Sequence, residues 1–258
     1  MSSDLLLQKL KEINGKSIDV YIPSLDKEVP FKPLNIRQQK EIIKASFDKN
    51  IPGISFNNIL NTIIKENCQE QNIELLVTDR PSIAIALRKN IFGTMIKNAV
   101  KSDTLNEESI EFDLEQVIQT KFKLDIKLTK VVKSEGLEVQ LRIPTLAADS
   151  RVNKESQKVL SHLVEQNNSI KDLISELFVY ELVKFIDFVE VLDVGKAVFT
   201  EISVVDQIKL VESLTAEVNK NIMEYIEEVR TFEKKYLSFT KNNKEYNINL
   251  DASFFSNE

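Results

Sequence analysis

The side chains that most often form catalytic nucleophiles and metal sites are scarce in this chain. It has one histidine, His162, and one cysteine, Cys68. A cysteine–histidine nucleophilic pair needs both side chains within hydrogen-bond reach, and no motif around either residue predicts that arrangement. Two such residues also cannot complete a zinc site built from Cys and His ligands. We therefore expect His162 to be a structural or surface residue and Cys68 to be a free structural thiol.

Phosphate binding and acid catalysis depend on patterns of commoner residues. The five glycines are isolated, so neither a P-loop nor a dinucleotide-binding fingerprint is present. The 40 acidic residues include neighbouring pairs such as Glu107-Glu108 and Glu227-Glu228, and paired carboxylates are the groups that glycoside hydrolases use. With so many acids in one chain, a solvated surface explains these pairs better. We expect no catalytic residue, no metal ligand, no cofactor and no small-molecule substrate.

The composition is that of a globular protein, with 42% hydrophobic and 29% charged residues. A net charge of −6 argues against a nucleic-acid partner. Lys121, Lys123 and Lys127 alternate with apolar residues, and we interpret them as the polar face of a hairpin, not as a nucleic-acid-binding strand. The most apolar stretch, 177–194, holds five charges, which excludes an ordinary membrane-spanning helix, and the first sixteen residues lack the apolar region of a signal peptide.

Residues 18–31 predict a β-hairpin followed by helices. Ile18, Val20 and Ile22 alternate with polar residues, a turn-rich stretch follows, and the alternation resumes at Val29 and Phe31. Pairing Ile22 with Val29 would place Val20 opposite Phe31. Helices are expected over 5–13, 36–47, 57–67 and 81–97. The helix over 36–47 begins with a capping-box pattern, Asn35 with Gln38.

The middle of the chain has the clearest strand pattern. Residues 101–109 are polar and predict a loop, whereas 122–128 and 137–143 alternate strictly between apolar and polar side chains. We expect an antiparallel hairpin that pairs Leu128 with Leu141, with a slip or bulge near its turn.

The remainder, from residue 147, predicts helices. One ends near Asn167, and the next runs from a capping box at Ser169 to about Leu192. A helical region follows over 208–236, with a break near Leu214-Thr215, and a short strand over 246–250. Phe254-Phe255 near the C-terminus must either fold back onto the protein or dock on a partner.

The predicted fold class is α+β: mostly helical, with an N-terminal β-hairpin, a central antiparallel β-hairpin or small sheet, and a C-terminal helical region. We expect three regions, 1–100, 101–146 and 147–258, packed as one compact unit or two closely packed subdomains.

Four blocks of this sequence, in order, resemble a known family. They comprise Ile18–Ala45, which includes Ile22-Pro23-Ser24 and Val29-Pro30-Phe31-Lys32-Pro33-Leu34; Asp79 with Leu87-Arg88 and Gly93; Val139–Thr145; and Tyr246–Phe255. The family is that of the baseplate hub subunits and hub assembly proteins of T-even-type contractile-tail phages. The chain departs from it at 99–108, where relatives carry a Cys-x-x-Cys pair, so no metal role is carried over.

The resemblance implies a structural protein of phage tail assembly, located in the virion baseplate or in the host cytoplasm during assembly. Its partners would be hub or tail-tube-initiator subunits, or further copies of itself, with no nucleic acid and no membrane involved. The candidate family-motif or interaction residues are Pro23, Phe31, Pro33, Leu34, Asp79, Arg88, Gly93, Pro144, Phe254 and Phe255. The alternatives are a cellular adaptor or chaperone without enzymatic activity, and a cell-wall hydrolase that uses acidic residues.

Overall fold

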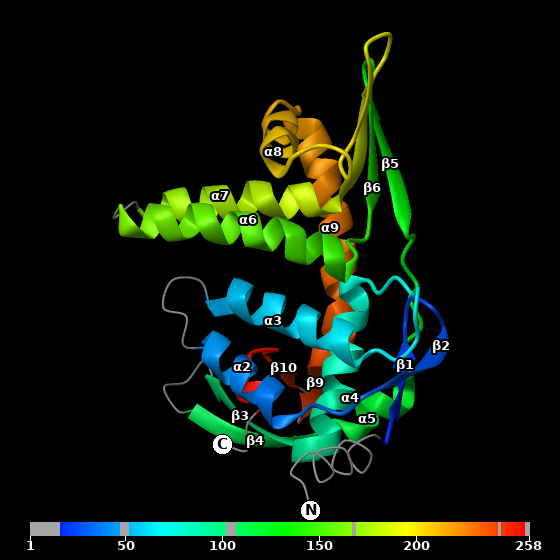
Figure 1. Cartoon of the computed structure of the whole chain (residues 1–258), viewed down its shortest axis with the longest axis vertical. Coiled ribbons are helices and arrows are strands. Elements are labelled where there is room, and N and C mark those ends of the chain that lie inside the picture. Colours follow the sequence, from blue (N-terminus) through cyan, green and yellow to red (C-terminus); the bar gives the residue numbers. More distant parts are fainter. Residues whose placement is uncertain (1–15, 47–51, 102–106, 167–168, 242–243, 256–258) are drawn as a thin grey trace, which may run out of the picture.

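The computed structural model describes residues 16–46, 52–101, 107–166, 169–241 and 244–255. A helical body carries two antiparallel helices above it and a protruding β-sheet at the far end (Figure 1). The helices are α2 (Ile36–Ser46), α3 (Pro52–Asn67), α4 (Arg80–Phe92), α5 (Glu115–Thr120), α6 (Leu146–Glu165), α7 (Ile170–Phe185), α8 (Val204–Glu212) and α9 (Ala216–Leu237). The strands are β1 (Ile18–Ile22), β2 (Lys27–Phe31), β3 (Met95–Lys101), β4 (Glu107–Asp113), β5 (Thr129–Ser134), β6 (Leu137–Arg142), β7 (Ile186–Val191), β8 (Gly195–Val198), β9 (Ser238–Lys241) and β10 (Lys244–Asn247).

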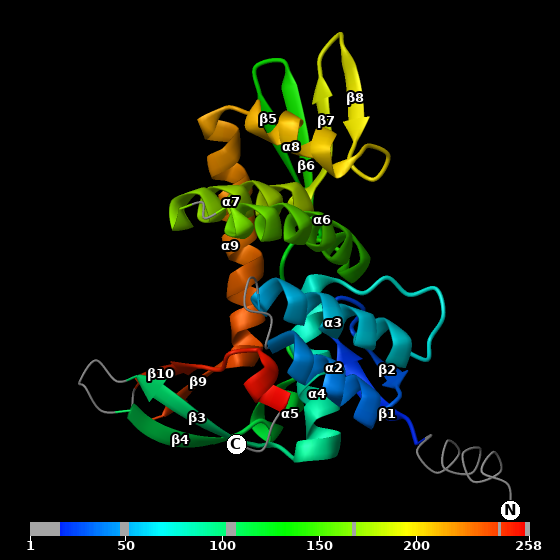
Figure 2. The same cartoon turned by 60° about the vertical axis from the view of Figure 1, so that its left-hand side comes forward.

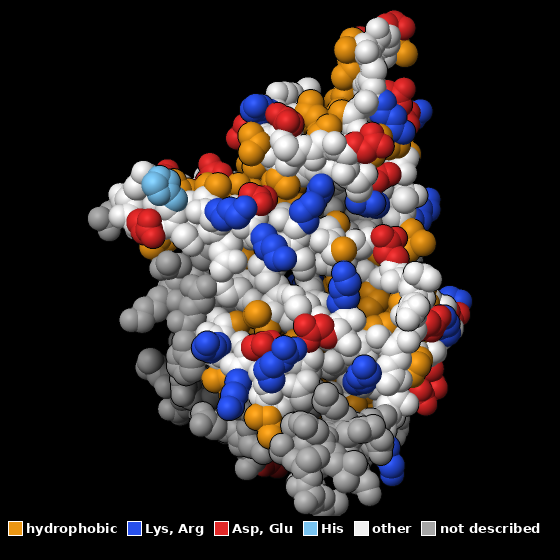
Figure 3. Space-filling view, viewed as in Figure 1, with side chains coloured by type: hydrophobic (Ala, Val, Ile, Leu, Met, Phe, Trp, Pro, Cys, Tyr) orange, Lys and Arg blue, Asp and Glu red, His pale blue; other side chains and the backbone are white. Residues whose placement is uncertain are grey.

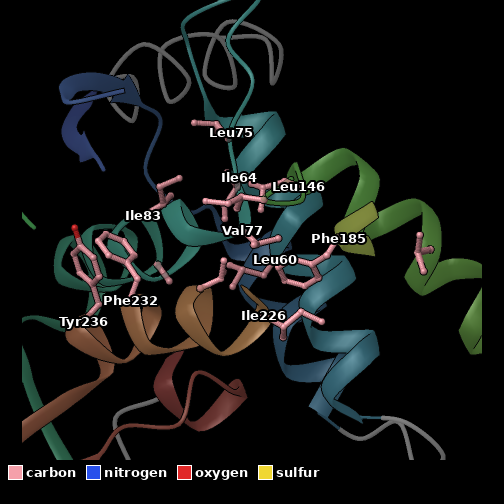
Figure 4. Close-up of a cluster of buried hydrophobic side chains, with 14 of the residues drawn as sticks. Leu60, Ile64, Leu75, Val77, Ile83, Leu146, Phe185, Ile226, Phe232 and Tyr236 are labelled. Atoms are coloured by element: carbon pink, nitrogen blue, oxygen red, sulfur yellow. The ribbon is translucent and has the colours of Figure 1, made fainter. Parts of the chain in front are cut away.

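This is the mostly helical α+β fold that the sequence predicts, with an N-terminal hairpin and small antiparallel sheets. The core is built from segments distant in sequence, and Figure 4 shows residues of α3, α4, α6, α7 and α9 packed together. Helix α9 runs from the body to the far sheet and touches α4, α7 and β5 (Figure 2). The predicted helix over 5–13 lies outside the described residues.

The N-terminal hairpin forms, but its predicted register is wrong by two residues. Ile22 pairs with Lys27, Val20 with Val29 and Ile18 with Phe31. The turn is therefore four residues long, and its Asp26 has a φ of 51°. Because side chains alternate with a period of two, both registers bury the same side chains, and alternation alone cannot separate them.

The helices of the body confirm the predicted capping box, the start of α2 at residue 36 and the end of α3 at residue 67, but two other boundaries differ. The backbone N–H of Gln38 donates to Asn35 Oδ1 at 3.0 Å, and the Asn35 N–H donates to Gln38 Oε1 at 3.2 Å. Helix α3 begins at Pro52, earlier than predicted. Helix α4 ends at Phe92, not near residue 97, because Gly93 takes a φ of 75° and the chain turns into β3. Strand β4 pairs with β3, so 107–109 are strand and not loop.

The predicted strand over 122–128 is wrong. The strand that forms the hairpin with β6 is β5, which places Val132 opposite Val139, and the two-residue turn between them includes Gly136 at a φ of 71°. Residues 122–128 pair with no strand in the part of the chain that the structure describes. Hydroxyls on α9 hold their backbone: Tyr236 donates to the Phe122 carbonyl at 2.7 Å and Tyr225 to the Lys127 carbonyl at 2.7 Å. The predicted apolar face is buried only in part: Phe122, Leu124 and Ile126 are partly buried against the core, whereas Leu128 is 53% exposed.

The helix predicted to reach Leu192 ends at Phe185, and the chain continues as β7, between β6 and β8 in the four-stranded sheet β5-β6-β7-β8. β-branched residues such as Ile186 and Val189 favour a strand. The free hydrogen-bonding edge of β6 then makes this segment a strand and not a continuation of α7. The predicted break near 214 is confirmed, because Thr215 caps α9. The predicted terminal strand over 246–250 is displaced to β10, which pairs with β9.

Candidate protein-interaction surfaces

The residues singled out by the family motifs lie mostly inside the protein. Pro23, Phe31, Leu34, Asp79, Arg88, Pro144, Phe254 and Phe255 are buried, Pro33 is partly buried and Gly93 is exposed. The contacts that the structure shows for them join parts of the same chain. The sequence left open whether Phe254 and Phe255 fold back onto the protein or dock on a partner. In the structure they fold back onto α2 and α4.

Asp79 fastens the N-terminal hairpin to the body. Its carboxylate accepts hydrogen bonds from the Ser24 backbone N–H at 2.9 Å, the Ser24 hydroxyl at 2.7 Å and the Leu76 N–H at 2.8 Å. Complete burial raises the pKa of Asp79, and these three donors oppose that rise. The hydrogen bonds between Ser24 and Asp79 therefore position the hairpin turn at the start of α4.

Arg88 joins the C-terminal motif segment to the chain that follows α4. Its Nε donates to the Phe254 carbonyl at 2.7 Å, its Nη1 to the Gly93 carbonyl at 2.5 Å and its Nη2 to the Met95 carbonyl at 3.1 Å. Burial lowers the pKa of this guanidinium, which nevertheless stays charged at neutral pH. In the same way, the Val77 N–H donates to the Pro144 carbonyl at 2.9 Å. These motif residues thus hold the N-terminal hairpin, the middle of the chain and the C-terminal turn together.

A chain of buried charges links the paired helices to the body, and the sequence patterns did not predict it. Asp149 on α6 accepts from Arg80 at 2.6 Å and Asn61 at 2.8 Å, and it pairs with Lys184 at 3.1 Å. Burial opposes ionisation of Asp149, but Arg80, Lys184 and Asn61 hold the pKa of its carboxyl below the usual value. Glu181 continues the chain, since it pairs with Lys184 at 3.0 Å.

Glu233 on α9 lies beside this chain of charges with no ion-pair partner within 4 Å among the described residues. Burial and the nearby carboxylates of Glu181 and Asp149 raise the pKa of Glu233 to about 7, against the opposing charge of Arg80. The junction of the helices therefore holds one acid that titrates near neutral pH.

Neither His162 nor Cys68 has an activated environment. His162 is exposed near the end of α6, with a ring nitrogen 2.9 Å from Gln166. Cys68 is half-buried, and burial raises the pKa of its thiol. In the part of the chain that the structure describes, no group of three or more His, Cys, Asp or Glu side chains could hold a metal ion. None of the described helices combines the length and apolar character needed to cross a bilayer.

Exposed apolar side chains gather at the end of the protruding hairpin formed by β7 and β8 (Figure 3). Val191 is 41% exposed, Leu192 70% and Val194 82%. We call these three residues the hairpin tip. Turns are normally polar, so apolar side chains here are unusual and indicate a contact surface.

A second apolar surface lies on α7. Ile174, Leu177 and Phe178 follow the i, i+3, i+4 spacing of one helix face and are 60%, 36% and 44% exposed. They line a hollow of about 440 Å³ that α3, α6 and α9 complete. The protein thus has both a protruding apolar hairpin and an apolar hollow, and periodicity could not distinguish either from core.

The comparison with protein families defines the class. The family model described as "T4 bacteriophage base plate protein" matches residues 16–254. The chain therefore belongs to the T4 bacteriophage base plate protein family, a class of structural phage tail proteins. No curated protein and no solved structure matches the chain significantly.

Proposed function

We propose that this protein helps to build the central hub of a contractile-tail baseplate, by binding hub or tail-tube-initiator subunits. Membership of the baseplate family supports the tail location. It acts by contact and not by catalysis, in line with the scarcity of nucleophiles and metal ligands in the sequence. The single observation that carries a binding role is the exposed hairpin tip.

Leaving the apolar hairpin tip in water has a free-energy cost. Burying a Val or Leu side chain stabilises by about 1.5–3 kcal/mol relative to leaving it exposed. Leu192 and Val194 gain only a small part of this in the isolated chain, since they are 70% and 82% exposed. A neighbouring subunit that covers both would recover it. The turn between β7 and β8, which carries them, protrudes beyond the helices (Figure 1).

The sheet presents the hairpin tip in a defined position. The Leu192 N–H donates to the Gly136 carbonyl at 2.8 Å, which ties the tip to the adjoining turn. The Lys196 ammonium lies 3.3 Å from the centre of the Phe188 ring. Strand β5, at the other edge of the sheet, packs on α9. A preorganised tip loses little conformational entropy on binding, which favours specific docking.

A binding experiment tests the proposal. The double variant Leu192→Ser, Val194→Ser is co-expressed with the hub and tail-tube-initiator subunits of the same phage, and recovered complexes are quantified. We expect at least tenfold less complex at an unchanged Tm, because the substituted side chains are exposed. The matched control is Ile36→Ser, which changes a side chain 71% exposed on the body. Equal recovery of the double variant and the control would refute the proposed role of the tip.

A further inference from the structure

The hairpin tip lies at an acidic end of the molecule. The Leu192 N–H donates to the Gly136 carbonyl at 2.8 Å and so holds the β7–β8 turn beside the β5–β6 turn. In Figure 3, acidic and apolar side chains lie next to each other at this end. The two turns and the residues beside them span 133–138 and 190–196. Their charged residues are four acids and two bases, a net charge of −2: Glu135, Glu138, Glu190 and Asp193, with Lys133 and Lys196.

Both lysines at this end already have partners within the sheet. The Lys133 ammonium pairs with Glu138 at 2.8 Å. Glu138, and to a smaller extent Glu190, raises the pKa of Lys133. The Lys196 ammonium lies 3.3 Å from the centre of the Phe188 ring, which is within the range of a cation–π contact. The sheet therefore holds both lysines, and the charge that this end offers to a partner is negative.

Three carboxylates at this end are not ion-paired. Glu135, Glu190 and Asp193 are exposed, and none of them lies within 4.0 Å of a basic nitrogen in the part of the chain that the structure describes. Glu190 is moreover the direct cross-strand neighbour of Glu138. Like charges in that position destabilise a sheet, so the isolated protein has an electrostatic cost here that a cationic neighbour would relieve.

We propose that the hairpin tip docks into an apolar pocket of a hub or tail-tube-initiator subunit, and that lysine or arginine side chains border this pocket. The inference rests on the proposed function, for which it specifies the chemistry of the partner surface. Leu192 and Val194 would fill the pocket, and Glu135, Glu190 and Asp193 would pair with its cationic border. An apolar centre with a charged rim is the usual anatomy of a specific protein interface.

The same carboxylates disfavour other occupants of the tip. Two copies of this chain that met tip to tip would bring two acidic ends together, and like charges across an interface cost free energy. The phosphates of a nucleic acid and the head groups of anionic lipids would be repelled in the same way. A basic protein surface is the partner that both the apolar and the acidic residues of this end fit.

The two kinds of side chain should affect binding differently. Charges at the rim of an interface mainly set the association rate and its dependence on salt, whereas the buried centre mainly sets the dissociation rate. Salt screens exposed charges over about 10 Å at 0.1 M ionic strength. Association of the protein with its partner should therefore slow as salt is raised, and the acidic rim should be the cause.

Neutralisation of the rim tests this inference. The variant Glu135→Gln, Glu190→Gln, Asp193→Asn removes three charges and nearly preserves shape. Asparagine also tolerates the φ of 61° found at Asp193. Its Tm should equal or exceed that of the wild type, because repulsion between Glu190 and Glu138 is lost. Binding to the purified hub and tail-tube-initiator subunits of the same phage is followed by biolayer interferometry over a series of NaCl concentrations.

We expect the rim variant to associate at least tenfold more slowly than the wild type at low salt, and at a rate that hardly changes with salt. Leu192→Ser, Val194→Ser should instead dissociate at least tenfold faster. The matched control is Asp19→Asn, Glu74→Gln, Glu165→Gln, which removes three exposed acidic charges elsewhere and should bind like the wild type.

Each other outcome has one meaning. A rim variant that binds like the wild type at low salt overturns the basic-bordered pocket, and the proposed function still stands if the Leu192→Ser, Val194→Ser variant loses its partner. If neither variant changes binding, or the wild type binds neither subunit, the proposed function fails as well. Sedimentation velocity of the protein alone gives the last outcome: self-association that the Leu192→Ser, Val194→Ser variant abolishes would place the tip between copies and overturn the inference.

Discussion

Arg88 Nε donates a hydrogen bond to the backbone carbonyl of Phe254, 2.7 Å away and 166 residues later in the chain. The same guanidinium also lies 5.7 Å from the centre of the Phe254 ring. Phe254 and Phe255 are each 2% exposed, and Phe255 packs near Phe56 of α3 with ring centres 6.3 Å apart. The C-terminal turn is therefore part of the core and is held there by a charged hydrogen bond.

The C-terminal phenylalanines should be required for stability. Phe254→Ala and Phe255→Ala should each lower the free energy of unfolding by about 3–5 kcal/mol, because each leaves a cavity in a packed core. Urea denaturation followed by circular dichroism measures this. Ile36→Ala, at an exposed position, is the control. A loss below about 0.5 kcal/mol, as surface substitutions show, would mean that these rings are not core.

Asp79→Asn should loosen the N-terminal hairpin. The variant keeps one oxygen acceptor but turns an amide N–H₂ toward donors that the carboxylate now accepts from, including Ser24 and Leu76. We expect a loss of about 1–3 kcal/mol, the cost of leaving buried groups unpaired. Ser24→Ala removes one of the three hydrogen bonds and should cost less. If Asp79→Asn unfolds at the denaturant concentration of the wild type, the carboxylate does not position the hairpin.

The buried charges between the helices should be stabilising only as a complete set. Asp149→Asn leaves Arg80 and Lys184 without their shared carboxylate and should cost about 3–5 kcal/mol. Glu155→Gln removes an exposed pair with Lys158 and should cost about 0–1 kcal/mol. Chemical denaturation of both variants tests the contrast. Similar losses in the two variants would show that Asp149 is effectively solvated.

Glu233 should make stability fall as pH rises toward neutral. Its pKa is raised from 4.5 to about 7, so the folded state favours the protonated acid. Its contribution to stability is fully present below pH 4.5 and is lost as pH rises to about 7. Glu233→Gln should therefore be more stable than the wild type at pH 8, by up to about 3 kcal/mol, and nearly equal at pH 4. A difference between the two proteins that does not change with pH would contradict the raised pKa.

Local sequence signals predicted several helix starts correctly. Asn35 with Gln38 and Ser169 with Asp172 act as caps in the structure, and the predicted break near Leu214-Thr215 lies where Thr215 caps α9. Each cap is a bond between residues three apart, so the information needed to predict it lies within one turn of sequence. The hairpin over 18–31 was likewise predicted, although its register was not.

Longer-range competition explains the errors. Residues 122–128 have an ideal strand pattern, but no partner strand reaches them and hydroxyls of α9 hold their backbone instead. Residues 186–191 continue an apolar helix pattern, but β6 and β8 flank them with hydrogen-bonding edges. In both cases the apolar side chains are buried only in part, since Leu128 and Val191 stay exposed, and the neighbouring element decides the secondary structure.

The sequence by itself determined the class of this protein: a mostly helical α+β chain, with caps and buried faces set by local spacing, whose ordered motif blocks identify a baseplate family. Only the tertiary structure decided what those motif residues do. Asp79 and Arg88 are candidate interaction residues in the sequence, yet both are buried and bind distant segments of the chain. Leu192 and Val194 are apolar and read as core, yet they remain exposed. Burial depends on which segments meet in space, and that is fixed by contacts between residues far apart in the chain.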